Sequence, residues 1–420
     1  MTFKDFNFDI KLQDSLDSIG FENPTPIQEQ AIPLIQEGND LIACAQTGTG
    51  KTAAFVLPII DALSKSEVET TFALIIVPTR ELALQIDQAL EGFAYFTGVS
   101  HLAIYGGSDG QVFAREKKAL VEGANIIVAT PGRLMAHLNM GYVKFNDIKF
   151  LVLDEADRML DMGFVDDIVK ITTYIPSKRQ TLMFSATMPE KIRSLAKKLL
   201  NNPKEISLSV SKPAVGVTQL AYLAYDTQKN KLITYLLKNK SHSSVIVFAS
   251  TKQKVKDLER DLLRAHFKIA AIHSDLDQAE REDALRQFRN KQLQVLVATD
   301  ILSRGIDIED ISLVINYDVP HDPEDYIHRI GRTARAEAKG MAITFINDFN
   351  QHKFGNIEQM IGYEIEKVPM PDFLGKGPEY NPSAKPKPFN KSPNKFPNKR
   401  VFKPKGPRNN GPNNSNPESK

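Results

Sequence analysis

The 420-residue sequence is poor in the features that mark secreted, membrane-spanning and cysteine-stabilised proteins. Its one cysteine, Cys44, excludes an internal disulfide framework and a zinc site built from cysteines. No apolar run approaches the roughly 18 residues that a bilayer-crossing helix needs, and the N-terminal stretch MTFKDFNFDI lacks the basic and apolar regions of a secretory signal. We therefore expect a globular protein of the reducing cytoplasm with no membrane partner.

Charge is divided unevenly along the chain, although the formal net charge is only +2. Residues 371–420 contain eleven Lys and Arg against three Asp and Glu, together with eleven of the 24 prolines. Such a composition buries too little apolar surface to fold alone, so we predict a disordered basic tail that attracts polyanions nonspecifically. Residues 1–370 carry a net charge of −6, so a polyanion would need individually placed contacts there.

Short apolar and β-branched runs alternate with longer segments of helical character, a pattern that predicts parallel α/β sheets. The pattern occurs twice, separated by a linker-like stretch at 207–218. We therefore predict two α/β domains, 1–211 and 212–370, followed by the tail. The runs expected as strands are 74–77, 126–129, 151–153, 182–184, 245–249, 269–272, 295–298, 313–317 and 342–346.

The segment AQTGTGKT (45–52) matches the P-loop pattern, except that Ala45 replaces the first glycine. Its glycines let backbone N–H groups turn toward phosphate oxygens at the start of a helix. Lys51 would reach the β- and γ-phosphates, and Thr52 would bind Mg²⁺. Taken alone, the segment could also be a flexible strand–helix turn. The predicted nucleotide contacts in this segment are Thr47, Gly48, Thr49, Gly50, Lys51 and Thr52.

A second segment that indicates nucleotide chemistry, LVLDEADRML (151–160), places carboxylates directly after an apolar run. In a P-loop protein an Asp at the end of a strand holds Mg²⁺, so we assign that role to Asp154, through a metal-bound water. Glu155 can then orient and deprotonate the water that attacks the γ-phosphate. A solvated acidic turn is the alternative, which the upstream P-loop disfavours.

Residues 154–157 read D-E-A-D, and the chain resembles the DEAD-box RNA helicases over nearly all of 1–365. The stretch RMLDMGF and the short basic tail are most similar to the bacterial RhlE-like subgroup. Three positions depart from the family pattern: Phe113 stands where a glutamine is expected, Ala334 replaces a glycine, and Ser303 in ILSRG is a minor change. The other matching segments are FENPTPIQ (21–28), PTRELA (78–83), GG (106–107), TPGR (130–133), SAT (185–187), VIVFAST (245–251), QAER (278–281), ATDILSRGID (298–307) and HRIGRTAR (328–335).

The resemblance implies two tandem RecA-like domains that close over ATP, Mg²⁺ and RNA. Gln28 would read adenine through its amide. Phe3 would stack on the base, with Phe6 as the fallback and core packing as the alternative role. Asp307 would accept hydrogen bonds from the ribose hydroxyls. The arginine fingers at the γ-phosphate would be Arg332 and Arg335, and the coupling residues would be Ser185, Thr187, His328 and Arg329.

The resemblance also assigns a set of RNA contacts, mostly to phosphates and 2′-hydroxyls, which predicts little sequence preference. These residues are Pro78, Thr79, Arg80, Gly107, Thr130, Arg133, Gln278, Arg281, Thr299 and Gly305. The implied activity is that of an ATP-dependent RNA helicase, an RNA-stimulated ATPase that unwinds or remodels RNA locally. An ATP-gated RNA clamp or assembly scaffold is the main alternative, and a DNA helicase or translocase is another. Ribonucleoprotein partners are compatible with each RNA-directed activity.

Overall fold

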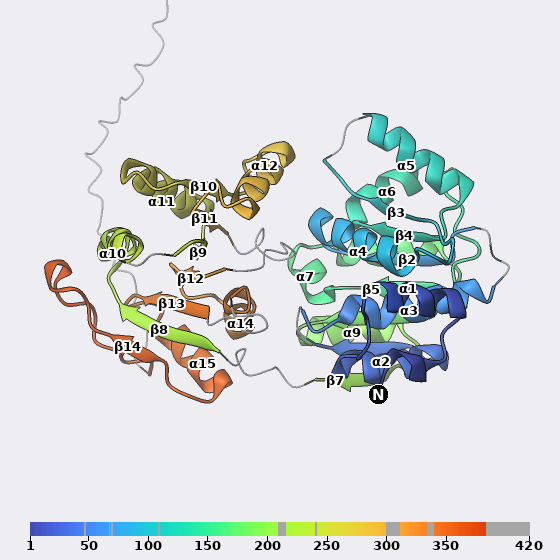
Figure 1. The fold of residues 1–420 in the computed structure, drawn as a ribbon, viewed down its shortest axis with the longest axis horizontal. Helices are drawn as coiled ribbons and strands as arrows, with labels where there is room; N and C mark the ends of the chain where they lie inside the picture. Colours follow the sequence, from blue (N-terminus) through green and yellow to red (C-terminus); the bar gives the residue numbers. More distant parts are fainter. Residues whose placement is uncertain are drawn as a thin grey trace, which may run out of the picture. The chain divides into compact units, whose positions relative to one another are not determined.

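The computed structural model describes residues 1–45, 48–66, 68, 70–107, 110–208, 216–239, 242–299, 311–333 and 340–383. These residues form two α/β lobes, each built on a seven-stranded sheet (Figure 1). The first sheet has the strand order β3-β4-β2-β5-β6-β1-β7, and the second has the corresponding order β10-β11-β9-β12-β13-β8-β14. Neighbouring strands pair in parallel in both sheets.

The first lobe runs from the N-terminus to β7. Its strands are β1 (Leu41–Cys44), β2 (Ala73–Ile76), β3 (His101–Ile104), β4 (Ile126–Ala129), β5 (Phe150–Leu153), β6 (Gln180–Ser185) and β7 (Lys204–Ser207). Its helices are η1 (Phe3–Phe6), α1 (Ile10–Ser18), α2 (Pro26–Gln36), α3 (Lys51–Ser64), α4 (Arg80–Phe93), α5 (Gly110–Glu122), α6 (Pro131–Asn139), α7 (Ala156–Asp161), α8 (Val165–Ile171), η2 (Thr172–Tyr174) and α9 (Glu190–Leu199).

The second lobe begins at β8. Its strands are β8 (Val217–Leu223), β9 (Val245–Phe248), β10 (Ile269–Ile272), β11 (Val295–Ala298), β12 (Leu313–Asn316), β13 (Gly340–Ile346) and β14 (Glu366–Val368). Its helices are α10 (Asp226–Asn239), α11 (Lys252–Arg264), α12 (Gln278–Arg289), α14 (Pro323–Ile330), α15 (Gln351–Ile361) and η3 (Asp372–Leu374).

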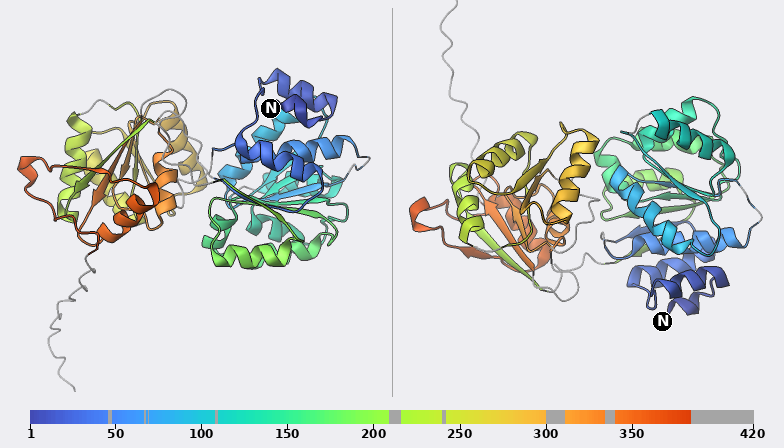
Figure 2. Two further views of the ribbon diagram at one scale, coloured as in Figure 1. Left: turned by 90° about the horizontal axis from the view of Figure 1, so that it is seen from below. Right: turned by 45° about the horizontal axis from the view of Figure 1, so that its top comes forward.

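Successive strand residues point to opposite faces of each sheet, and helices cover both faces (Figure 2). In β1, for example, Leu41 and Ala43 join the core beneath α1 to α4, whereas Ile42 joins the core beneath α5 to α9. Burial on both faces explains why the inner strands read as continuous apolar runs rather than as alternating ones. The predicted α/β fold with parallel sheets is confirmed.

The strands that the sequence analysis did not name include the edge strands β3, β7 and β14. In β7 only Ile206 is buried, and β14 contains no fully buried residue. β7 and β14 therefore lack the continuous apolar run by which the inner strands are recognised. The predicted domain boundary near residue 212 lies outside the described residues, although the chain passes from one sheet to the other between Ser207 and Val217.

The described part of the predicted tail, residues 371–383, packs against the second lobe. Gln228 donates through Nε2 to the carbonyl oxygen of Leu374 at 2.8 Å, and Gln351 donates to that of Glu379 at 2.7 Å. The Tyr380 hydroxyl hydrogen-bonds the Glu358 carboxylate. The prediction of disorder from residue 371 onward is therefore wrong for 371–383, because polar side chains of the lobe satisfy its backbone; residues 384–420 lie outside the described part.

Among the described residues, none of the helices is both long enough and apolar enough to span a bilayer.

Candidate functional site

Three segments predicted to bind nucleotide or couple its hydrolysis meet at one edge of the first sheet. Strand β6 lies between β1 and β5, with Cys44 in register with Ser185 and Leu153 in register with Met183. Because the strands are parallel, the loops that follow their carboxyl ends emerge on the same side, where open α/β sheets bind ligands. The P-loop, the SAT segment and Asp154 are thereby brought together.

The P-loop turns into α3 through glycines in the left-handed region. Gly48 and Gly50 have φ of 84° and 92°. A Cβ at Gly50 would lie 2.4 Å from Nε2 of Gln28 and 2.8 Å from the Thr25 hydroxyl, so a larger residue does not fit. Lys51, the first residue of α3, is only 6% exposed, and its Nζ is buried with no hydrogen-bond partner among the described residues. A buried ammonium without a partner is costly unless an anion joins it, which suits a phosphate.

Gln28 is buried in α2, and its amide connects the FENPTPIQ segment (21–28) to the P-loop. Oε1 accepts a hydrogen bond from the backbone N–H of Thr25 at 2.8 Å, and Nε2 donates to the carbonyl oxygen of Gly50 at 3.0 Å. The adenine contact predicted for this residue is not tested by these bonds. They do reveal a second role, holding the end of the P-loop, that the sequence analysis missed.

The rings of Phe3 and Phe6 are not available for stacking on a base. They are 1% and 5% exposed, and Phe3 packs against Phe6 and Phe21 with ring centroids 5.8 Å and 5.6 Å apart. The structure thus corrects the assignment of Phe3 to the cofactor site and supports the alternative, a core anchor. Phe21, directly before the Glu-Asn-Pro-Thr-Pro segment, is only partly buried, so its ring is more accessible than that of Phe3.

Asp154 is a buried acid at the end of β5. It is 2% exposed, and its Oδ1 accepts from the backbone N–H of Glu155 at 2.9 Å. Burial raises the pKa of Asp154 to about 6; Lys51 opposes this rise, and the Glu155 carboxylate adds to it. Lys51 does not offset the cost of burial, so Asp154 is an acid without a sufficient counter-charge.

Glu155 adopts a left-handed backbone conformation, with φ of 52° and ψ of 50°. A non-glycine residue in this region is uncommon and bears strain, which concentrates at functional sites. The Glu155 carboxylate accepts a hydrogen bond from NH1 of Arg158 at 3.2 Å, one turn further along α7. This pair fixes the carboxylate that we predict to be the general base.

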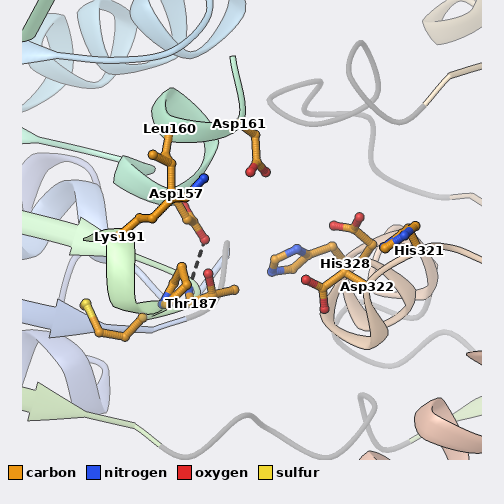
Figure 3. Close-up of a pocket in the computed structure, with 11 residues that line it drawn as sticks. Asp157, Leu160, Asp161, Thr187, Lys191, His321, Asp322 and His328 are labelled. Atoms are coloured by element: carbon orange, nitrogen blue, oxygen red, sulfur yellow. Dashed lines mark hydrogen bonds between the residues drawn. The ribbon is translucent and has the colours of Figure 1, made fainter. Parts of the chain in front are cut away.

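Asp157, the last residue of the DEAD segment, bonds to the SAT segment rather than extending into the metal site. Its backbone N–H donates to the Ser185 hydroxyl at 3.2 Å, and its carboxylate accepts from the backbone N–H of Thr187 at 3.0 Å (Figure 3). Ser185 is fully buried. The predicted coupling residues of the first lobe are therefore in direct contact with the strand end that carries Asp154.

The predicted RNA contacts of the first lobe follow β2, β3 and β4, at the same edge of the sheet. Thr79 caps α4 by accepting from the backbone N–H of Leu82 at 3.3 Å, and Thr130 occupies the cap position of α6. Gly107 has φ of 84°. Arg80 lies over the Tyr105 ring, 4.5 Å from its centroid. Pro78 lies between β2 and α4, so the set forms a row of helix starts.

Fewer of the second-lobe predictions can be placed. Gln278 begins α12, Arg281 donates to the carbonyl oxygen of Ser274 at 3.2 Å, and Thr299 follows β11. His328 lies in α14, near Asp322 in Figure 3. Arg332 is 8% exposed. Thr47, Gly305, Asp307 and Arg335 lie outside the described residues.

Arg329, predicted to couple the two sites, is buried within the second lobe. Its NH1 donates to Oδ1 of Asn316 and to the carbonyl oxygen of Asp318, both at 3.0 Å. Its guanidinium lies 5.2 Å from the centre of the Phe248 ring. These contacts join α14 to the ends of β9 and β12, so the residue supports the helix that carries His328.

Comparison with known proteins assigns the chain to a family. The DEAD/DEAH box helicase model matches residues 25–195, and the helicase conserved C-terminal domain matches 228–337. ATP-dependent RNA helicase CshA of Listeria monocytogenes is 45% identical over 345 residues, which cover 82% of this chain and 66% of that protein. The chain belongs to the DEAD-box RNA helicase family. ATP-dependent RNA helicase DeaD of Haemophilus influenzae is 40% identical over 89% of this chain, but the match spans only 61% of its own length.

Solved structures of DEAD-box proteins agree with the fold. Saccharomyces cerevisiae Dbp5 bound to RNA and ADP BeF3 is 32% identical, with a TM-score of 0.78 over 89% of this chain and 96% of that one. Mss116p bound to ssRNA and AMP-PNP is 28% identical, with a TM-score of 0.76 over 89% and 80% of the two chains. The predicted pair of RecA-like domains is thus confirmed.

The second lobe of this DEAD-box protein has a self-contained ion pair where the first has its nucleotide site. By strand order β12 corresponds to β5, and β8 to β1. Asp318, just after β12, accepts from Nζ of Lys229 at 3.0 Å and from Nζ of Lys254 at 2.8 Å. Burial alone would raise the pKa of Asp318, but Lys229, Lys254 and Ser250 hold it well below its usual range. Lys229 is fully buried, as Lys51 nearly is, but the ion pair with Asp318 already neutralises its charge.

The residues of the first-lobe site fit a magnesium nucleotide. Mg²⁺ is usually held by one or two carboxylates, substrate phosphates and several waters, rather than by a cage of protein ligands. The described residues contain no group of three or more His, Cys, Asp or Glu side chains able to bind a metal. They do contain a buried ammonium without a partner and a buried acid without a sufficient counter-charge. A nucleotide with its metal supplies both missing charges.

Proposed function

We propose that this DEAD-box protein is an ATP-dependent RNA helicase that couples ATP binding and hydrolysis to local unwinding or remodelling of RNA. The observation that carries the proposal is the buried Lys51 ammonium, which has no partner among the described residues and lies beside Asp154. The second lobe supplies the contrast, because its corresponding Lys229 and Asp318 neutralise each other. Of these two described lysine–aspartate sites, the one in the first lobe therefore needs an external phosphate and cation.

Each residue at the first-lobe edge has a role in this proposal. Lys51 and the P-loop amides bind the phosphates. Thr52 and Asp154 would hold Mg²⁺, which would supply positive charge beside the phosphates. Glu155, fixed by Arg158, orients the attacking water and accepts its proton. Arg332 and Arg335 contribute positive charge at the γ-phosphate when the lobes close.

Adenine recognition by Gln28 is compatible with its bonds to the chain. A glutamine amide has two N–H donors and an oxygen with two lone pairs. One donor and one acceptor are used on Gly50 and Thr25, which leaves one of each for the base. Phe21, rather than Phe3, is then our candidate for stacking on adenine, and Asp307 remains the candidate for the ribose.

RNA would lie along the row of helix starts that follows β2, β3 and β4, and along the start of α12 in the second lobe. Backbone amides and threonine hydroxyls at these positions reach phosphates without reading bases. The proposed contacts are Pro78, Thr79, Arg80, Gly107, Thr130 and Arg133 in the first lobe, and Gln278, Arg281, Thr299 and Gly305 in the second. The relatives named for RNA helicase activity, and the neighbours bound to RNA, support this assignment.

The deciding experiment measures ATP turnover with and without RNA, and with matched single-stranded DNA. Stimulation by RNA alone is expected. A rate that RNA does not change would refute the proposal, and equal stimulation by DNA would favour a DNA helicase. Displacement of a strand from a short RNA duplex then separates a helicase from an ATP-gated RNA clamp, which would hydrolyse ATP without releasing the strand.

Two finer assignments belong to the same proposal. The stretch RMLDMGF (158–164) supports a place near the RhlE-like subgroup, although the relatives described above are named CshA and DeaD. The bacterial origin of these relatives and the single cysteine support action in a reducing cytoplasm.

A further inference from the structure

A cluster of polar and aromatic side chains joins α5 to α6 in the first lobe, away from the nucleotide. At its centre Oε2 of Glu116 accepts a hydrogen bond from Nε of Arg133 at 2.8 Å and lies 2.7 Å from its NH2. The same oxygen lies 3.0 Å from Nε2 of His137. His137 also hydrogen-bonds the Tyr142 hydroxyl through Nδ1. One carboxylate oxygen thus connects two residues that lie four apart on α6.

Glu116 is an unusual residue for its position on a surface helix. It is 1% exposed, and its other oxygen, Oε1, is buried with no hydrogen-bond partner in the described part of the chain. Burying an ionised carboxylate with half of its acceptor capacity unused is costly. An apolar side chain would fill the same space without that cost, so packing alone does not explain an acid here. The negative charge of Glu116 instead stabilises the Arg133 guanidinium in its position.

Phe113 also contacts the Arg133 guanidinium, and it stands where the family pattern has a glutamine. The guanidinium of Arg133 lies 4.6 Å from the centre of the Phe113 ring. The same ring stacks on His137, with centroids 4.2 Å apart and planes 13° apart. A glutamine at this position could donate to RNA, whereas phenylalanine cannot. The substitution therefore exchanges a direct polar contact for an aromatic surface that a planar guanidinium can lie against.

We propose that Glu116, assisted by Phe113, is a positioning residue for RNA binding that fixes the orientation of Arg133. The inference rests on the proposed function, since it requires that Arg133 contacts RNA. An unrestrained arginine side chain loses rotamer freedom when it is immobilised on a ligand. Glu116 and Phe113 remove that freedom before RNA arrives, so less is lost on binding. Loss of the expected glutamine contact at 113 is compensated by this preorganisation.

The test compares the RNA dependence of ATP turnover for Glu116→Gln, Phe113→Leu and Arg133→Gln in the full chain. The matched control is Glu122→Gln on the same helix, whose exposed carboxylate pairs only loosely with Lys118 at 3.8 Å. For Glu116→Gln we expect the RNA concentration at half-maximal turnover to rise about tenfold, since the ion pair with Arg133 becomes a hydrogen bond in which only the guanidinium is charged. The maximal turnover at saturating RNA should stay within about twofold of the wild type, because the nucleotide site is unchanged.

Combining the variants shows whether Glu116 acts through Arg133. The double variant Glu116→Gln with Arg133→Gln should bind RNA no more weakly than Arg133→Gln alone, because the orienting carboxylate has nothing left to orient. Additive effects would overturn the inference. So would a Glu116→Gln protein that behaves like Glu122→Gln, or one in which maximal turnover falls while the half-maximal RNA concentration does not change.

Failure of the inference can be told apart from failure of the proposed function. If Arg133→Gln leaves the RNA dependence unchanged, the RNA role of Arg133 is wrong. If Arg133→Gln weakens RNA binding but Glu116→Gln does not, only the positioning role is wrong. Should Glu116→Gln fail to fold, Phe113→Leu decides, since its half-buried ring can be replaced with little loss of packing; it should raise the half-maximal RNA concentration about threefold, and no change would overturn the inference.

Discussion

Asp154→Asn should stabilise the nucleotide-free protein while abolishing its activity. Burial raises the pKa of Asp154 from its ordinary value of 3.8 to about 6. At neutral pH the charged carboxylate therefore destabilises the fold by about 3 kcal/mol, at 1.36 kcal/mol for each pKa unit. Asparagine has nearly the same shape and retains an oxygen for the Glu155 N–H bond, so it removes this cost without leaving a cavity. Magnesium binding and ATP hydrolysis should both be lost.

The raised pKa of Asp154 also determines how the stability of the protein changes with pH. The folded protein holds the proton on Asp154 more tightly than the unfolded chain does, so ionisation destabilises the folded state. This cost is absent below pH 3.8, grows between pH 3.8 and about 6, and is complete above pH 6. The stability difference between Asp154→Asn and the wild type should follow the same course, rising to about 3 kcal/mol at pH 7.5.

Urea denaturation in the presence of a metal chelator measures this difference, and Asp318→Asn is the matched control. Asp318 occupies the corresponding strand end of the second lobe, but it neutralises the buried Lys229. Its replacement should destabilise the protein by about 2 kcal/mol, because the buried Lys229 ammonium then keeps only the half-exposed Asp226 carboxylate as an ionic partner. Addition of Mg²⁺ and a non-hydrolysable ATP analogue should stabilise the wild type and leave Asp154→Asn nearly unchanged. If Asp154→Asn is no more stable than the wild type at pH 7.5, the reasoning is refuted.

Three further predictions follow from the site and the chain's end. Gly50→Ala should lower the free energy of unfolding by about 2 kcal/mol in urea denaturation and weaken binding of an ATP analogue, because the added Cβ would clash with the Gln28 amide at a residue with positive φ. The control Gly92→Ala adds a Cβ with nothing within 4 Å, so it should be neutral or stabilising in the same assay. Glu155→Gln should bind ATP and RNA but turn over at least about a hundredfold more slowly in a phosphate-release assay, and a near-normal rate would exclude it as the base. Removing residues 384–420, with ten Lys and Arg against one Glu, should weaken RNA binding about tenfold in low salt and little in high salt; fluorescence anisotropy that shows no change in low salt would exclude a role in RNA binding.

Local sequence was sufficient to locate most of the sheet and the centre of the nucleotide site. The inner strands are apolar because both of their faces are buried, so each can be read from a few consecutive residues. Lys51, Asp154 and Glu155 each follow such a strand, and their chemistry is legible from residue type and order. The edge strand β7 and the packing of 371–383 were missed, because each depends on contacts with residues far away in the chain.

The roles of Phe3, Gln28 and Glu116 could not be predicted from the sequence, because they depend on tertiary contacts. The order of the residues gave the fold class, the two lobes and the groups able to grip a nucleotide, since those depend on hydrophobic pattern and on chemistry at strand ends. Only the folded chain determined that Phe3 is enclosed in the core, that Gln28 holds the P-loop, and that Lys51 lacks the partner that Lys229 has. Burial and pairing are properties of the surroundings, and an identical side chain has a different free energy of ionisation or of hydrogen bonding in each of them.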